Sequence, residues 1–141
     1  MKRVTGLGGI FFKAKDPKAL AEWYRVHLGM DVTAWGGVTF RWADDSPTGT
    51  TVWTPFKEDT GYFAPSTAPF MINFRVADLH ALLAALTAEG CDVQDKVDES
   101  EYGKFGWVVD PALEGGMAYQ RSVKEYPNPP APNIARFGRG G

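Results

Sequence analysis

The sequence predicts an α+β protein built from two tandem βαβββ modules, and three observations support that fold class. The stretch GIFFKAKDPKALAEWY at residues 9–24 is followed by the similar stretch MINFRVADLHALLAAL at residues 71–86. Each stretch begins with residues that alternate between two faces of a strand, and continues with apolar residues at helical spacing. Three further strand-like segments follow each helix. The order of elements is therefore the same in both halves of the chain.

The first module begins with a strand over residues 10–14, whose Ile10, Phe12 and Ala14 share one face. Asp16 is suited to cap the following helix, and Pro17 is suited to its first turn. Gly29 then ends the helix, because glycine adopts the left-handed conformation of a helix C-cap at little cost. The later strands of this module are expected near residues 31–32, 37–44 and 50–56.

The second module repeats this order from Met71. Its first strand places Ile72, Phe74 and Val76 on the face that corresponds to Ile10, Phe12 and Ala14. Asp78 stands at the capping position, and Gly90 ends the helix. The apolar face of that helix consists of Leu79, Leu82, Leu83 and Leu86. The later strands are expected near residues 92–93, at 103–110 and from residue 115 onward.

The two faces of each first strand have different expected roles. The faces with Ile10 and Ile72 should pack against the helices. The opposite faces carry Gly9, Phe11 and Lys13 in the first half, and Met71, Asn73 and Arg75 in the second. These residues should therefore face something other than a helix.

We expect one domain over residues 1–124, with modules at about 5–58 and 68–122 joined by the linker at 57–69. The tail at residues 125–141 is rich in proline and glycine, which excludes both a helix and a central strand. Such a tail is ordered only when it packs on its own domain or on a partner chain.

The composition argues against several classes of partner. With 15 Lys and Arg against 17 Asp and Glu, the net charge is −2, so no nucleic-acid partner is expected. The sequence has neither a secretory signal nor an apolar run long enough for a membrane span, which predicts a cytoplasmic protein without a membrane partner. The one cysteine, Cys91, is expected to be a small buried residue.

Three segments resemble the vicinal oxygen chelate superfamily, which includes glyoxalase I, extradiol dioxygenases and bleomycin-resistance proteins. They lie at residues 15–32, 75–93 and 102–111, and the resemblance covers residues 5–122. It implies two modules whose sheets curl into an incomplete β-barrel, with the helices on the convex side. A ligand cavity would then lie on the concave face, which would carry the residues around Gly9 and Met71.

Enzymes of this superfamily hold a divalent metal with His, Gln and Glu side chains from the first and last strands of each module. Those positions correspond here to Gly9, Val52, Met71 and Met117. None supplies a carboxylate or an imidazole, the ligands that such metals prefer. We therefore expect no metal and no other cofactor in the cavity. Glu114 could be a stray ligand, but a solvated carboxylate is the simpler interpretation.

The remaining titratable residues do not form a catalytic constellation. His80 points away from the leucine face of its helix and is expected at the surface. His27 is expected to pack on the convex side of the sheet. The pair Asp44 and Asp45 precedes SPTG, which is typical of a turn.

The expected ligand site combines aromatic and apolar residues with a few polar groups on the concave face. Asn73 and Arg75 would orient the ligand, with Arg41 as a further candidate. Arg75 could either clamp a ligand carboxylate or pair with an acidic neighbour, and the sequence leaves both roles open. The candidate ligand-binding residues are Phe11, Trp53, Met71, Asn73, Arg75, Trp107, Met117 and Tyr119.

Two functions follow from these observations. The first is a metal-independent protein of the glyoxalase and bleomycin-resistance type that binds a small molecule in the concave cavity, without an assigned catalytic residue. The alternative is a lyase or dioxygenase of the same superfamily that acts on a small carbonyl or aromatic substrate. Members of the superfamily often pair two chains, so a homodimer is expected in either case.

Overall fold

The computed structural model describes residues 1–110 except 2, 46, 48, 101 and 102, together with residues 119–125 and 134–139. Its elements are helix α1 (Pro17–Leu28), the short 3-10 helix η1 (Trp42–Asp44), strand β1 (Met71–Arg75), helix α2 (Leu79–Ala88), and strands β2 (Asp92–Ser100), β3 (Gly103–Asp110), β4 (Tyr119–Glu125) and β5 (Ile134–Arg139). None of the described helices combines the length and the apolar character needed to cross a bilayer.

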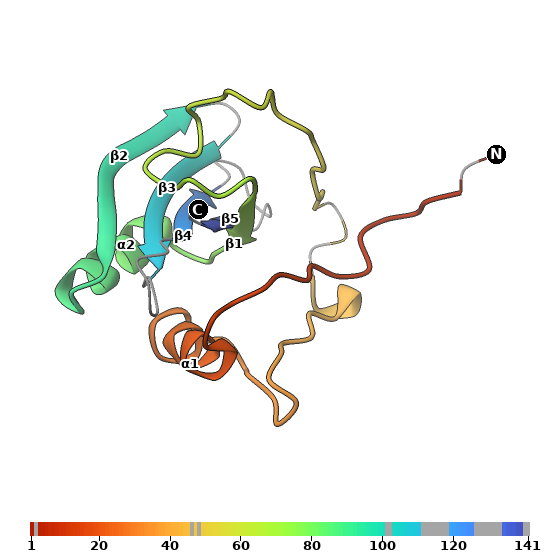
Figure 1. Ribbon diagram of the computed structural model, residues 1–141, viewed down its shortest axis with the longest axis horizontal. Helices are drawn as coiled ribbons and strands as arrows, with labels where there is room; N and C mark the ends of the chain where they lie inside the picture. Colours follow the sequence, from red (N-terminus) through yellow and green to blue (C-terminus); the bar gives the residue numbers. More distant parts are fainter. Residues whose placement is uncertain are drawn as a thin grey trace.

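The five strands form one sheet in the order β1-β5-β4-β3-β2. Neighbouring strands in this order run antiparallel, and residues 73–75 of β1 also pair in parallel with residues 122–124 of β4. The sheet is partly curled, with β2 and β3 bending around one side of the molecule (Figure 1). The predicted α+β class, with a curled sheet and two helices, is confirmed at this level.

Both helices begin at the predicted caps because their first turns find local hydrogen-bond acceptors. The Asp16 carboxylate accepts a hydrogen bond from the Ala19 amide at 3.0 Å, and Asp78 accepts one from the Ala81 amide at the same distance. Gly29 ends α1 with a φ of 63°, a left-handed conformation that a residue with a Cβ adopts less readily. These boundaries are set by residues within the helices themselves or beside them.

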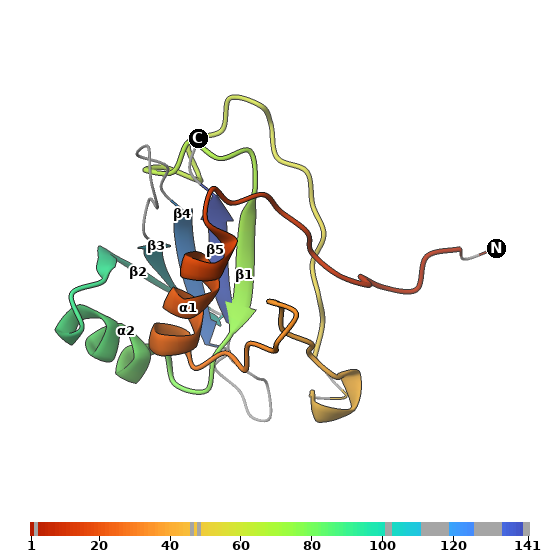
Figure 2. The same cartoon turned by 60° about the horizontal axis from the view of Figure 1, so that its bottom comes forward.

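The two helices pack on the same face of the sheet, and Figure 2 shows α1 in front of the strands. The central buried residues come from α1, β1 and α2, namely Leu20, Tyr24, Ile72, Leu79 and Leu83. Phe74 and Val76 pack against this cluster. The expectation that the Ile72 face of β1 carries the helices is confirmed.

The strands predicted for the first half are not formed in this structure. Among the described residues before Met71, α1 and η1 are the regular elements and none is in a strand. The segments predicted as strands at 10–14, 37–44 and 50–56 therefore require correction, and the second of them contains η1 instead. Figures 1 and 2 show the N-terminal segment running away from the sheet. The physical reason is that a strand forms its hydrogen bonds with a neighbouring strand, and none lies beside these segments.

The prediction for the C-terminal tail also requires correction, because the tail contributes β5, which lies between β1 and β4 in the sheet. β5 pairs with both β1 and β4. The prolines that argued against a strand all precede it, at residues 127, 129, 130 and 132. Ile134–Arg139 contains no proline, so each of its backbone amides has a hydrogen to donate. A boundary at residue 124 therefore does not separate the tail from the domain.

Candidate functional site

The face of the sheet opposite α1 and α2, called the concave face here, carries a pocket beside β3. On the helix side, α2 approaches so closely that a Cβ at Gly106 would lie 2.8 Å from Cδ1 of Leu83. Because side chains alternate along a strand, the neighbours of Gly106, Phe105 and Trp107, belong to the concave face. Trp107 is nevertheless only 2% exposed. Something other than the helices must therefore cover it.

The cover is the segment just before β1, which passes inside the curve of the sheet (Figure 1). The Tyr62 ring meets the Trp107 ring edge-on, with centroids 6.3 Å apart. Tyr62 is itself held by Phe56, whose ring stacks on it at 5.4 Å. A pocket of about 160 Å³ remains between this segment and the sheet, and we call it the Trp107 pocket. Its lining consists of Gly61, Tyr62, Ala64, Gln94, Lys96 and Trp107.

Lys96 supplies the positive charge of the Trp107 pocket. Its Nζ lies 4.7 Å from the centroid of the Trp107 ring and 6.0 Å from that of Tyr62, within the range of a cation–π contact. Lys96 also forms an ion pair with Asp98 at 3.6 Å, but both side chains are at least half exposed. Such surface pairs hold a side chain weakly. The ammonium group therefore remains available to a ligand.

The indole N–H of Trp107 has no hydrogen-bond partner among the described residues, although its nitrogen is buried. A buried donor without an acceptor costs about 1–3 kcal/mol. Buried tryptophans usually find a partner for this group. The Trp107 side chain also lines the Trp107 pocket.

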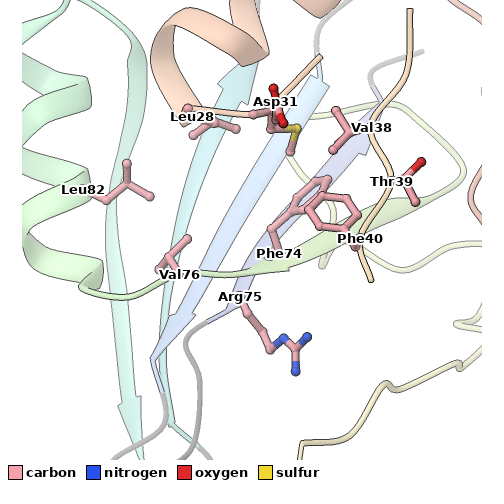
Figure 3. Close-up of a pocket in the computed structure, with 11 residues that line it drawn as sticks. Leu28, Asp31, Val38, Thr39, Phe40, Phe74, Arg75, Val76 and Leu82 are labelled. Carbon is pink, nitrogen blue, oxygen red and sulfur yellow. The ribbon is translucent and has the colours of Figure 1, made fainter. Parts of the chain in front are cut away.

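A second cavity, of about 320 Å³, lies on the opposite side of β1, among the helices (Figure 3). It is enclosed by the end of α1, the segment around residue 40, β1 and α2. The Phe40 and Phe74 rings form one wall, with centroids 6.2 Å apart. Its lining consists of Leu28, Gly29, Met30, Asp31, Val38, Thr39, Phe40, Phe74, Arg75, Val76 and Leu82. Five of these residues also pack against the central core, so the cavity lies at the edge of that core.

Arg75 lies at the rim of this second cavity and points away from the aromatic rings in Figure 3. Its guanidinium forms an ion pair with Asp45, and both side chains are about one-third exposed or less. Of the two roles left open by the sequence, the structure thus contains the pair with an acidic neighbour. Asp45 follows η1, in the region where a turn was predicted.

The other predicted ligand residues do not gather around one pocket. Met71 and Asn73 are half-buried in β1, but neither lines the Trp107 pocket or the second cavity. Phe11 is 94% exposed and Trp53 is 77% exposed, and both lie in segments without strands. Tyr119 begins β4 opposite Asp110. Met117 lies outside the described residues, as does Glu114.

Of the positions expected from the sequence to correspond to metal ligands, the described ones are Gly9, Val52 and Met71, and none offers a carboxylate or an imidazole. Gly9 has no side chain, Val52 has no donor atom, and the thioether of Met71 is a soft ligand. Val52 is also 69% exposed. No reaction step is therefore assigned to a metal at these positions.

The two histidines lie on the helix side of the molecule. His80 is exposed on α2 and contacts Glu99 at 2.8 Å. His27 packs against the Trp23 ring at 5.2 Å, and its Nδ1 lies 2.6 Å from Oε1 of Glu89. Cys91 is half-buried nearby, and burial, followed by the Glu89 carboxylate, raises the pKa of its thiol.

Lys96 and Gln94 were not identified as site residues from the sequence. They stand two positions apart in QDK, so that alternation along a strand puts both on one face. This spacing could have indicated that both residues belong to the site. It is informative only if β2 is known to extend through residues 94–96.

Comparison with protein families gives one match. A family model described as a glyoxalase-like domain matches residues 9–114, well over half of the chain. The matched range contains all the residues that line the Trp107 pocket and the second cavity. No curated protein and no solved structure gave a significant match.

Proposed function

The chain belongs to the family of glyoxalase-like domains, and on that premise we propose that it binds a small acidic aromatic molecule on the concave face without a metal ion. In this proposal it resembles bleomycin-resistance proteins rather than the metal-dependent enzymes of the superfamily. The binding site is the Trp107 pocket.

The observation on which the proposal rests is the buried indole N–H of Trp107. This donor has no partner among the described residues, yet its side chain lines a pocket. A ligand oxygen that reaches this nitrogen would accept the hydrogen bond and recover the free energy that the free protein loses. A carboxylate oxygen is the strongest such acceptor, because hydrogen bonds to charged groups are shorter and stronger.

The charge and shape of the pocket favour an acid with one aromatic ring. Lys96 provides a cation for the carboxylate, and Tyr62 and Trp107 provide aromatic surface for the ring. Pockets for drug-sized ligands measure about 300–1,000 Å³. At about 160 Å³ the Trp107 pocket admits a smaller molecule, of the size of a single substituted ring.

The alternative function is a lyase or dioxygenase that acts on a small carbonyl or aromatic substrate. In this superfamily that chemistry depends on a metal that polarises substrate oxygens. The residues at the corresponding positions, Gly9, Val52, Met71 and Met117, have no suitable donors. Binding without catalysis is therefore the better-supported function.

The proposal includes a homodimer, in which a second copy covers apolar side chains of the first half. Most of the exposed large hydrophobic residues lie between Val4 and Phe56. They include Leu7, Ile10, Phe11, Phe12, Trp35, Phe40, Trp42, Val52 and Trp53. Where such side chains form a contiguous exposed patch, they are typical of an interface between chains. Sedimentation equilibrium should give twice the chain mass, and a monomer at all concentrations would exclude the dimer.

The binding proposal is tested with pairs of aromatic carboxylates and their carboxamides, followed by thermal shift and tryptophan fluorescence. The carboxylates should bind and the neutral carboxamides should not. Lys96→Met should weaken carboxylate binding at least about tenfold, since a hydrogen bond to a charged group contributes about 1.5–3 kcal/mol.

The matched control is Lys18→Met, which removes the same charge from the exposed face of α1. It should leave the affinity unchanged. Equal binding of carboxylates and carboxamides would contradict the proposed ligand class. A loss of binding in Phe40→Ala, with Lys96→Met unaffected, would instead place the ligand in the second cavity.

A further inference from the structure

Three side chains with metal-binding atoms meet on the helix side of the sheet, and none of them stands at a sequence position that corresponds to a metal ligand of the superfamily. His27 lies in the last turn of α1, Glu89 follows α2 as its C-cap, and Cys91 follows Gly90. The His27 nitrogen, a Glu89 oxygen and the Cys91 sulfur all lie within 4.8 Å of one another. We propose that this His27–Glu89–Cys91 cluster is a zinc site that joins the ends of the two helices.

The ligand atoms are near enough for one ion to contact all three after adjustment of the side chains. Zinc binds sulfur at about 2.3 Å and nitrogen or oxygen at about 2.0–2.2 Å, which places tetrahedral ligand atoms about 3.3–3.6 Å apart. His27 Nδ1 and Glu89 Oε1, at 2.6 Å, need to separate by less than a bond length to admit the ion between them. The ligand atoms lie within 4.8 Å of one another, so the most distant pair must approach by up to about 1.5 Å when zinc binds.

The set of donors selects a class of metal. A thiolate with an imidazole is typical of zinc and of other late transition metals, whereas Mg²⁺ and Ca²⁺ prefer oxygen ligands. The Cys91 thiol binds as the thiolate, so its proton passes to solvent when the metal binds. Three protein ligands leave the fourth tetrahedral position for a water molecule.

The electrostatic environment also favours a cation. The carbonyl end of a helix carries a partial negative charge, and α2 has no basic residue in its last turn. Glu89 adds a full negative charge at this end, which is the unfavourable end for a carboxylate. A bound metal ion compensates both charges.

The site is partly preorganised and accessible. The His27 side chain is 19% exposed, and the Trp23 ring packs against its imidazole. The Glu89 side chain is 42% exposed, so zinc can enter from that side. Since the cluster lies on the helix side, it is independent of the Trp107 pocket on the concave face, and either proposal can fail without the other.

The test measures binding of Zn²⁺ by the purified full chain, in competition with a chromophoric chelator. The wild type should bind one ion per chain, and Mg²⁺ should not compete. Removing even an outer-shell partner of a metal site commonly costs 10–100-fold in affinity. Cys91→Ser and His27→Gln should therefore each weaken zinc binding at least about tenfold.

The chain offers a matched control in the second His–Glu pair. His80 contacts Glu99 at a similar distance, and no cysteine belongs to that pair. His80→Gln should therefore bind zinc as the wild type does. Circular dichroism of each variant shows whether it keeps its helices.

A second readout uses the wild-type protein alone and does not depend on the folding of any variant. Co²⁺ bound through Cys91 should produce a thiolate-to-cobalt charge-transfer absorption band. The proposal is overturned if Co²⁺ binds without this band, if the wild type binds no zinc stoichiometrically, or if folded Cys91→Ser binds zinc as tightly as the wild type.

Discussion

The two halves of the internal repeat have similar sequences but different structures. Both contain a helix that begins at an aspartate cap and is followed by a glycine with positive φ. Among the residues that the structure describes, those that form strands all lie from Met71 onward, and their strands make up the described sheet. The large apolar residues of the first half are mostly exposed, whereas those of α2 and β3 are mostly buried.

The difference shows which structures a local sequence can determine. A helix satisfies its backbone hydrogen bonds within itself and at its caps, so the same short signals give the same result in both halves. A strand satisfies its hydrogen bonds only when another strand lies beside it. The alternating pattern of residues 10–14 is thus not enough by itself to determine a strand.

The largest expected effect comes from a leucine of α2 compared with an aromatic residue of the first half. Leu79 is fully buried, so Leu79→Ala should lower the free energy of unfolding by about 2–5 kcal/mol. Phe11 is 94% exposed within one chain, so at protein concentrations where the chain is monomeric Phe11→Ala should change it by less than about 0.5 kcal/mol. Urea denaturation measures both.

A large decrease in the free energy of unfolding of Phe11→Ala would contradict this comparison of the two halves. It would mean that residue 11 belongs to a packed surface, either in a first-half strand of the predicted tandem fold or at the proposed dimer interface. Repeating the measurement over a range of protein concentrations separates these two cases, because only an interface makes stability depend on concentration.

A smaller effect is expected at the hydrogen bond that connects the first half to the sheet. The Tyr24 hydroxyl of α1 donates to Oδ2 of Asp110 in β3 at 2.9 Å, and both residues are buried. Tyr24→Phe removes this donor and should cost about 1.5–3 kcal/mol, the range for hydrogen bonds to charged groups.

The control for Tyr24→Phe lies one position further along α1. Arg25→Met opens an exposed ion pair with Glu22 and should leave the urea midpoint nearly unchanged. If Tyr24→Phe is equally neutral, α1 is not held to the sheet through Asp110, and the contact between the two halves is looser than the structure indicates.

The smallest effects are expected at the two helix caps, where the halves should behave alike. Asp16→Ala and Asp78→Ala each remove a 3.0 Å hydrogen bond to a first-turn amide, and each should cost about 0.5–2 kcal/mol. Thermal unfolding followed by circular dichroism compares them directly. A cost at Asp78 without one at Asp16 would show that even the helix of the first half contributes little to the stability of the fold.

The parts of the fold that could be predicted from the sequence are those with local causes. The caps, the glycine after each helix and the alternation of Ile72, Phe74 and Val76 all follow from neighbouring residues. β5 could not be predicted in this way, because its partners β1 and β4 are distant in sequence and prolines precede it. The prolines lie in the segment before the strand and do not prevent the strand itself from forming.

The candidate site was predictable only in part for the same reason. Trp107 was identified as a strand aromatic on the concave face, and it lines a pocket there. Lys96 and Gln94 were missed, since the length of β2 depends on its pairing with β3. The sequence left two roles open for Arg75, a contact with a ligand or an ion pair with an acidic neighbour. It could not decide between them, because Asp45 is distant in sequence and approaches Arg75 only in the folded protein.

The most direct test of the account compares two tryptophans that the sequence placed in the same site. Trp107 is buried in the pocket, whereas Trp53 is 77% exposed in the first half. Titration with a single-ring aromatic carboxylate such as 4-nitrobenzoate should quench the fluorescence of the wild type and of Trp53→Phe to saturation, with equal affinity. Trp107→Phe should show neither the saturable quenching nor a thermal shift. Wild-type affinity in Trp107→Phe, together with loss of binding in Trp53→Phe, would contradict a ligand site in the second half of the chain.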